Sequence, residues 1–237
     1  MAFYDNQSGY AANRWAPSVL APAEATIIKQ SYLLLGLSVT AALAGGYLGA
    51  TSELMIRVFG SWMGWIFALI VINVLPRVAI SARHSGSLGL AALVANGFVS
   101  GLVLAPILAM AAAFAPNIIL ASLLITAAVF LAVTIYVLST TRTFSPSRGI
   151  MTGVIVSLFG AMLLNGFLHI GWLGIAIAAG IGIFGVFTLV YATSDVLRSR
   201  QADSAIPGAL MLFAGLFNVF VATLNILLAF SGGRSRD

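Results

Sequence analysis

The sequence has no cysteine and very little charge. Without cysteine, the 237 residues cannot form disulfides, thiolate nucleophiles or thiolate metal sites. Only 7% of the residues are Asp, Glu, Lys or Arg, whereas a typical soluble domain has about 25%. Eleven basic and six acidic side chains cannot cover a water-soluble surface, and 61% of the residues are hydrophobic. The composition therefore indicates an integral membrane protein.

Enzyme motifs are also absent. The sequence has no His-Glu-x-x-His zinc motif, no Gly-x-Gly-Asp protease motif and no P-loop. Its two histidines, His84 and His169, are too few for a metal site and fall on opposite sides of the membrane in the topology predicted below. The basic residues are scattered in ones and twos instead of forming the basic stripe of a nucleic-acid-binding protein. We expect no enzyme activity, no metal, no cofactor and no nucleic-acid partner.

Runs without charge predict seven membrane-spanning helices, because about 20 apolar residues cross the hydrocarbon of a bilayer. The two longest runs, 85–141 and 149–194, each have room for two helices. Their turns are expected at Ala115-Pro116-Asn117 and at His169-Ile170-Gly171-Trp172. The runs are continuously apolar, which excludes the alternating pattern of a membrane β-barrel. Three further runs hold one helix each, over residues 30–50, 58–76 and 204–233.

The predicted spans divide the chain into an N-terminal tail (1–28), a seven-helix transmembrane domain (29–231) and a short C-terminal tail (232–237). The N-terminal tail and the even-numbered loops carry eight Lys and Arg residues, and the opposite side carries three. Because basic residues favour the cytoplasmic side, we expect a cytoplasmic N-terminus and an external, periplasmic C-terminus.

Two features indicate how the helices pack. Pro106 lies inside the third predicted span and should bend it. Pairs of small residues four positions apart allow helix backbones to approach closely in lipid. Such pairs are Gly45 with Gly49, Gly97 with Gly101, and Ala178 with Gly182.

No acidic residue lies in the middle of a predicted span, although a proton or cation pathway usually needs one there. Asp195 comes closest, at the end of the sixth span. It is either a solvated carboxylate beside Arg198 or part of an ion pathway. Asn165 and Asn218 are further candidates for such a pathway, because both are polar and lie within predicted spans. The neutral polar residues at depth are Asn73, Asn96, Asn165, Asn218 and Asn225.

Several stretches, taken with the seven short-looped helices, resemble the Bax inhibitor-1 family, most closely its bacterial YccA-like branch. The resemblance covers about residues 25–230. It implies an all-α membrane fold of six helices around a hydrophobic seventh, in the bilayer of the bacterial inner membrane. The stretches that carry it are Gly101 through Pro106-Ile107-Leu108, Tyr136 to Arg142, Tyr191-Ala192-Thr193-Ser194-Asp195, and Leu216 to Val221.

The resemblance implies two candidate functions. Family members are described as pH-sensitive calcium-leak proteins, and YccA-like members as modulators of the FtsH membrane protease and its HflK–HflC partners. Calcium-leak members carry a pair of acids where this sequence has Ala192 and Gly215. This departure favours a non-enzymatic modulator of a membrane protein machine. The alternatives are a cation (Ca²⁺/H⁺) leak channel and a structural accessory subunit of a larger membrane complex.

A modulator needs a surface that a partner protein can reach. The N-terminal tail is polar, contains no predicted span and carries several aromatic side chains, among them Tyr4, Tyr10 and Trp15. These three residues are the candidates for partner binding, together with the exposed faces of the helices.

Overall fold

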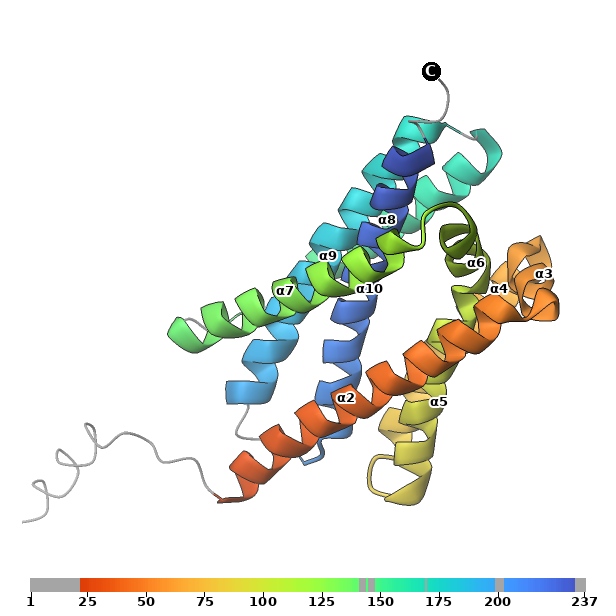
Figure 1. Cartoon of the computed structure of the whole chain (residues 1–237). Helices are drawn as coiled ribbons and strands as arrows, with labels where there is room; N and C mark the ends of the chain where they lie inside the picture. Colours follow the sequence, from red (N-terminus) through yellow and green to blue (C-terminus); the bar gives the residue numbers. More distant parts are fainter. Residues whose placement is uncertain (1–21, 141–143, 145–147, 169, 199–202, 233–237) are drawn as a thin grey trace, which may run out of the picture.

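The structure, a computed structural model, describes residues 22–140, 144, 148–168, 170–198 and 203–232. The partner-binding candidates Tyr4, Tyr10 and Trp15 lie outside these residues. The described part of the chain contains helices and no strand, which confirms the all-α prediction (Figure 1). The helices are α2 (Pro22–Thr51), α3 (Glu53–Gly60), α4 (Trp62–Ser81), α5 (Ser87–Val103), α6 (Ala105–Phe114), α7 (Asn117–Ser139), α8 (Arg148–Leu168), α9 (Gly171–Arg198) and α10 (Ile206–Gly232).

Six of these helices, α2, α4, α7, α8, α9 and α10, are each long and apolar enough to cross a membrane. Helices α5 and α6 pass the same test together, with a bend of 49° between them, and would form a seventh span. The bend lies at Leu104, directly before the first turn of α6, which contains Pro106. The bend that Pro106 predicted is therefore confirmed, and the described helices match the predicted seven-helix bundle.

The second span differs from the prediction at both ends. Val58 belongs to the short helix α3, which was not predicted, and α4 continues past Pro76 to Ser81. The cause is local: the Ser61 side chain accepts a hydrogen bond from the Gly64 N–H at 3.1 Å and so starts a new helix. The prediction of a span over 58–76 was wrong because a run without charge does not reveal a helix cap. At the N-terminus, α2 begins at Pro22, ahead of the boundary expected at residue 29.

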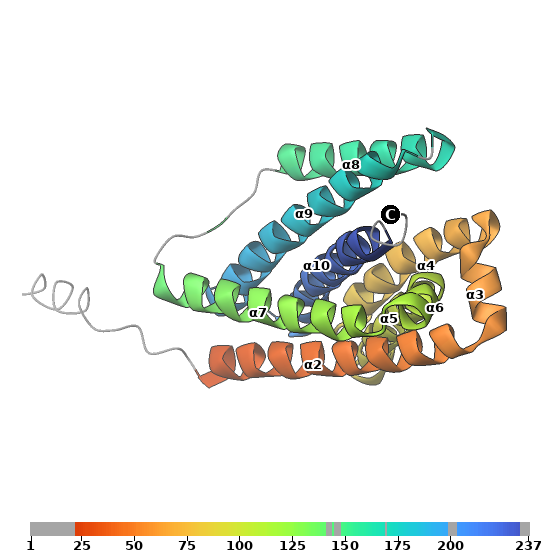
Figure 2. The ribbon, with the colours of Figure 1, turned by 45° about the horizontal axis from the view of Figure 1, so that its top comes forward.

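Helix α10 lies at the centre of the bundle, as the family resemblance implied for the seventh span. It packs most extensively on α9 and also contacts α7, α2, α5 and α4. Figure 2 shows α10 between α9 on one side and α4 and α5 on the other, with α8 at the outer edge beside α9. Helix α8 packs mainly on α9. None of the residues in its most apolar stretch is buried, whereas α10 has the largest buried share of the six single-helix spans.

Helices α2 and α5 are held together through glycines at four-residue spacing. A Cβ atom on Gly97 would lie 2.4 Å from the Ser38 carbonyl oxygen, and one on Gly101 would lie 2.0 Å from the Ala42 carbonyl oxygen. A Cβ on Gly45, from the other helix, would lie 2.0 Å from the Phe98 carbonyl oxygen. The predicted close contact of helix backbones is therefore confirmed for this pair, and only glycine fits at these positions.

Candidate functional site

The two positions that carry acids in calcium-leak relatives lie in the apolar core between α9 and α10. Ala192 is fully buried in a cluster that includes Val137, Leu189 and Leu212. Gly215 lies directly against α9, because a Cβ atom there would be 2.7 Å from Leu189 Cγ. This part of the bundle is closed by hydrocarbon side chains, and neither position offers an oxygen ligand to a cation.

The three ion-pathway candidates lie at different levels along α9. Asn165 lies beside Gly174 near the start of α9, and Asn218 packs against Gly185 in the middle. Asp195 is exposed near the end of α9. With a rise of about 1.5 Å per residue, successive levels are separated by about 15 Å. The structure therefore does not bring Asp195, Asn165 and Asn218 together into one ligand set.

Helix α9 is anchored at its end by Arg198. The guanidinium donates hydrogen bonds to the carbonyl oxygen of Val137, at 2.6 Å, and to that of Thr140. These are carbonyls of the last turn of α7 and of the residue that follows it, and the last carbonyls of a helix have no partner within the helix. Arg198, treated in the sequence as a topology signal, thus also joins the ends of α7 and α9.

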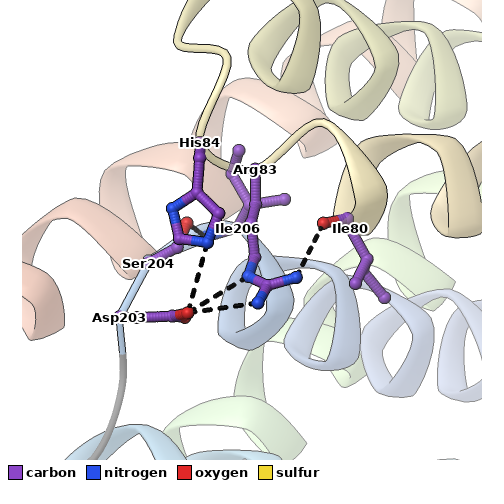
Figure 3. A network of polar contacts seen from close by, with 6 residues as sticks. All are labelled: Ile80, Arg83, His84, Asp203, Ser204 and Ile206. Atoms are coloured by element: carbon purple, nitrogen blue, oxygen red, sulfur yellow. Dashed lines mark hydrogen bonds and ion pairs between the residues drawn. The ribbon is translucent and has the colours of Figure 1, made fainter.

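A polar network joins two connections that are 120 residues apart in the chain (Figure 3). Asp203, just before α10, accepts hydrogen bonds from Arg83 Nε at 3.3 Å and from a terminal nitrogen of the same guanidinium at 3.2 Å. His84 Nε2 lies 3.3 Å from the same carboxylate oxygen. Ser204 Oγ accepts from the Ile206 N–H at 3.3 Å, as expected for a cap of the last helix. The network ties the α4–α5 connection to the start of α10.

The sequence did not predict this network. Arg83 and Asp203 lie in different connections between predicted spans, and the sequence gives no reason to pair them. Hydrogen bonds from Arg83 hold the pKa of the Asp203 carboxyl below its usual value, and the positive charge of Arg83 and His84 adds to this effect. Because the pKa of Asp203 is lower in the folded than in the unfolded protein, its contact with Arg83 stabilises the fold at pH values above the usual pKa of an aspartate. This stabilisation is lost as the pH falls through the pKa of Asp203 in the folded protein.

We predict that Asp203→Ala speeds hydrogen exchange at the Arg83 and Ser85 amides, which are bonded to the Ile80 and Ala82 carbonyls. The effect should be at most a few-fold, because the ion pair is exposed. Hydrogen exchange with mass spectrometry checks it, with Glu53→Ala as the control that removes an exposed acid from α3. Unchanged exchange in Asp203→Ala would show that the network does not order the α4–α5 connection.

Described residues of the bundle also form two sizeable cavities. The first, of about 620 Å³, lies among α8, α9 and α10, with Trp62 of α4 also in its lining, and contains the amide side chains of Asn165 and Asn225. The second, of about 630 Å³, is lined mainly by apolar residues of α2, α5, α6, α7 and α10. Neither cavity is lined by a charged side chain. Among the described residues, no group of three or more His, Asp or Glu side chains could hold a metal ion.

Comparison with known proteins gives one family. The family model described as "Inhibitor of apoptosis-promoting Bax1" matches residues 24–232, which include every span described above. An uncharacterized protein of Campylobacter jejuni is 28% identical over 98% of this chain and 99% of its own length. An uncharacterized protein of Neisseria meningitidis serogroup A is 31% identical over 87% of this chain and 92% of its own length.

A further relative has a name that describes its function. The Escherichia coli K12 protein "Modulator of FtsH protease YccA" is 29% identical over 89% of this chain and 91% of its own length. The match thus extends over nearly the whole bundle. Together with the family model, it confirms the resemblance seen in the sequence. The chain belongs to the Bax inhibitor-1 family of multi-pass membrane proteins.

Proposed function

We propose that the protein is a non-enzymatic modulator of a membrane protein machine in the bacterial inner membrane, and that this machine is the FtsH protease with its HflK–HflC partners. The observation that carries the proposal is the apolar packing at Ala192 and Gly215, which leaves the α9–α10 seam without acids. Without an acid pair for ion conduction, the function depends on the partner protein that binds the surface of the bundle and its tail. The name of the E. coli relative, similar along nearly the whole bundle, supports FtsH as the partner.

The proposal gives the N-terminal tail the role of a partner-binding segment. We infer that the tail lies in the cytoplasm, because the connections on its side of the membrane carry most of the basic residues. Helix α2 begins at Pro22, so the tail can be removed without shortening the first span. Its aromatic side chains Tyr4, Tyr10 and Trp15 would supply the apolar contact area that protein interfaces use.

We predict that deleting residues 2–21 leaves the protein inserted and folded but lowers the amount of FtsH and HflK–HflC that co-purifies with it. Affinity purification in mild detergent with mass spectrometry measures this, and the triple change Tyr4→Ala, Tyr10→Ala and Trp15→Ala is the full-length counterpart. As a control, the protein that lacks residues 2–21 should have the same melting temperature as the full-length protein, which shows that the deletion does not unfold the bundle. Equal recovery of the partners from deleted and full-length protein would place the binding surface on the helices instead.

We also predict no pH-gated calcium flux from the wild-type protein in liposomes. Calcium needs several oxygen ligands, usually with carboxylates among them. Ala192 and Gly215 supply none, and Asp195 lies about 15 Å along α9 from the level of Asn218. A calcium-sensitive dye inside the vesicles measures the flux. A calcium flux that Asp195→Asn abolishes would contradict this prediction and favour the leak-channel function over the protease modulator.

A further inference from the structure

One of the two cavities described above lies between α8 and α10. Both helices pack on α9, and the space between them has a volume of about 620 Å³, within the range of ligand-binding cavities. Its floor on α9 combines the small residues Gly171, Gly174 and Ala178 with Ile177 and Ile181, and its walls come from α8, α10 and Trp62 of α4. We refer to this cavity as the α8–α10 groove. The small residues of its floor give an elongated apolar ligand room to lie along α9.

Two amide side chains, one on α8 and one on α10, line the α8–α10 groove. Asn165 Oδ1, on α8, accepts a hydrogen bond from the Ile170 N–H at 3.1 Å. Its nitrogen, Nδ2, lies over the floor, 3.4 Å from the position of a Cβ atom on Gly174. Asn225 Nδ2, on α10, donates to the Val221 carbonyl oxygen at 2.8 Å. Because each amide nitrogen carries two hydrogens, both side chains keep at least one N–H for a ligand.

The depth of these amides identifies what they can bind. Asn165 is three residues from the end of α8, and Asn225 is seven residues from the end of α10. At about 1.5 Å per residue, they lie about 5 to 10 Å inside the helix ends. Helix α10, with 27 residues, is about 40 Å long and so spans the hydrocarbon and both interfacial regions. The amides therefore lie near the boundary between hydrocarbon and headgroups, where the ester carbonyls of membrane lipids are found.

We propose that the α8–α10 groove binds one diacyl phospholipid from the surrounding leaflet. The ester carbonyl oxygens accept hydrogen bonds from Asn165 and Asn225, and an acyl chain runs from there along Gly174 and Ala178 towards the centre of the bilayer. The ligand satisfies two amides that would otherwise face hydrocarbon, where an unpaired polar group is costly. No charged side chain lines the groove, so the lipid is recognised at its ester groups and not by the charge of its headgroup.

Native mass spectrometry of the full-length protein tests the proposal. The protein is reconstituted in vesicles of phosphatidylethanolamine and phosphatidylglycerol and extracted in mild detergent. We expect one retained phospholipid per wild-type chain. Gly174→Leu places a side chain in the α8–α10 groove and should lower the retained fraction about tenfold or more. The matched control is Gly153→Leu, on a part of α8 with open space around it, which should retain lipid like the wild type.

A second variant keeps the test decisive if Gly174→Leu does not fold. Asn225→Leu removes one of the two donors and otherwise breaks only a bond within its own helix. It should lower retention about threefold to tenfold, the range of an interhelical hydrogen bond in lipid. Vesicles made from either phospholipid alone should give similar retention. The proposal would be overturned if the wild type, Asn225→Leu and any folded Gly174→Leu retained equal amounts of phospholipid. It would also be overturned if the wild type retained only detergent, or if it strongly preferred one of the two headgroups.

Discussion

Replacing Gly101 by alanine should lower the melting temperature of the protein by about 10 °C. A Cβ atom at this position would lie 2.0 Å from the Ala42 carbonyl oxygen and 2.7 Å from the Gly46 nitrogen. Both are backbone atoms, so no side-chain movement can make room and α2 and α5 must separate. Overpacking costs about 3 kcal/mol in such cases, and about 3 kcal/mol corresponds to about 10 °C for a protein of this size.

The matched control for Gly101→Ala is Gly36→Ala, on an exposed face of α2 with open space around it. The same added methyl group should there be neutral or slightly stabilising, because alanine favours the helix more than glycine does. Tryptophan fluorescence of the detergent-purified protein during heating measures both midpoints. If the two variants melt together, the close approach of α2 and α5 does not hold the bundle in the way described.

Replacing Ala192 by aspartate should destabilise the protein about as strongly as Gly101→Ala does. The Ala192 side chain is fully buried beside Leu189 and Leu212, and burying a carboxyl group there without a hydrogen-bond partner costs about 3 kcal/mol or more. Gly215→Asp adds overpacking against Leu189, because even its Cβ atom would lie 2.7 Å from Leu189 Cγ. We therefore expect loss of folded protein, and not a working ion site, when both acids are installed.

The control for Ala192→Asp is Ala192→Ser, whose hydroxyl can bond to its own helix backbone. The serine variant should melt within a few degrees of the wild type. Because burial disfavours the charged form of a carboxyl group, part of the loss in the aspartate variant should be recovered near about pH 4. A folded Ala192→Asp, Gly215→Asp double variant that conducts calcium would show that the contact between α9 and α10 can open to accommodate two acids.

The arrangement of the spans was predictable because the hydrophobic requirement of a bilayer acts on each helix separately. Charge-free runs placed the spans, Pro106 predicted the bend between α5 and α6, and glycines four residues apart predicted the tight helix contacts. Helix α3 was missed because its eight residues include Glu53 and Arg57, which form an exposed ion pair within the helix. A short helix with a charged face leaves no apolar run in the sequence.

The polar contacts between helices were not predictable, because they depend on which helix ends meet. Arg83 and Asp203 are 120 residues apart, and nothing in either segment indicates its partner. Arg198 likewise reaches the Val137 carbonyl of another helix. Asn165 and Asn225 were each recognised as polar residues at depth, but only the packing of α8 and α10 on α9 places them in one groove. The acid positions Ala192 and Gly215 were visible in the sequence through the family resemblance, and their burial came from the structure.

Proteolysis by FtsH in reconstituted vesicles tests the proposed function most directly. Purified FtsH, with and without HflK–HflC, is reconstituted with a membrane-protein substrate and increasing amounts of the full-length chain. We predict that the chain changes the initial rate of substrate degradation in a saturable manner. The chain that lacks residues 2–21 should have little effect. An unchanged rate at saturating full-length chain, both with FtsH alone and with HflK–HflC present, would contradict the proposed function.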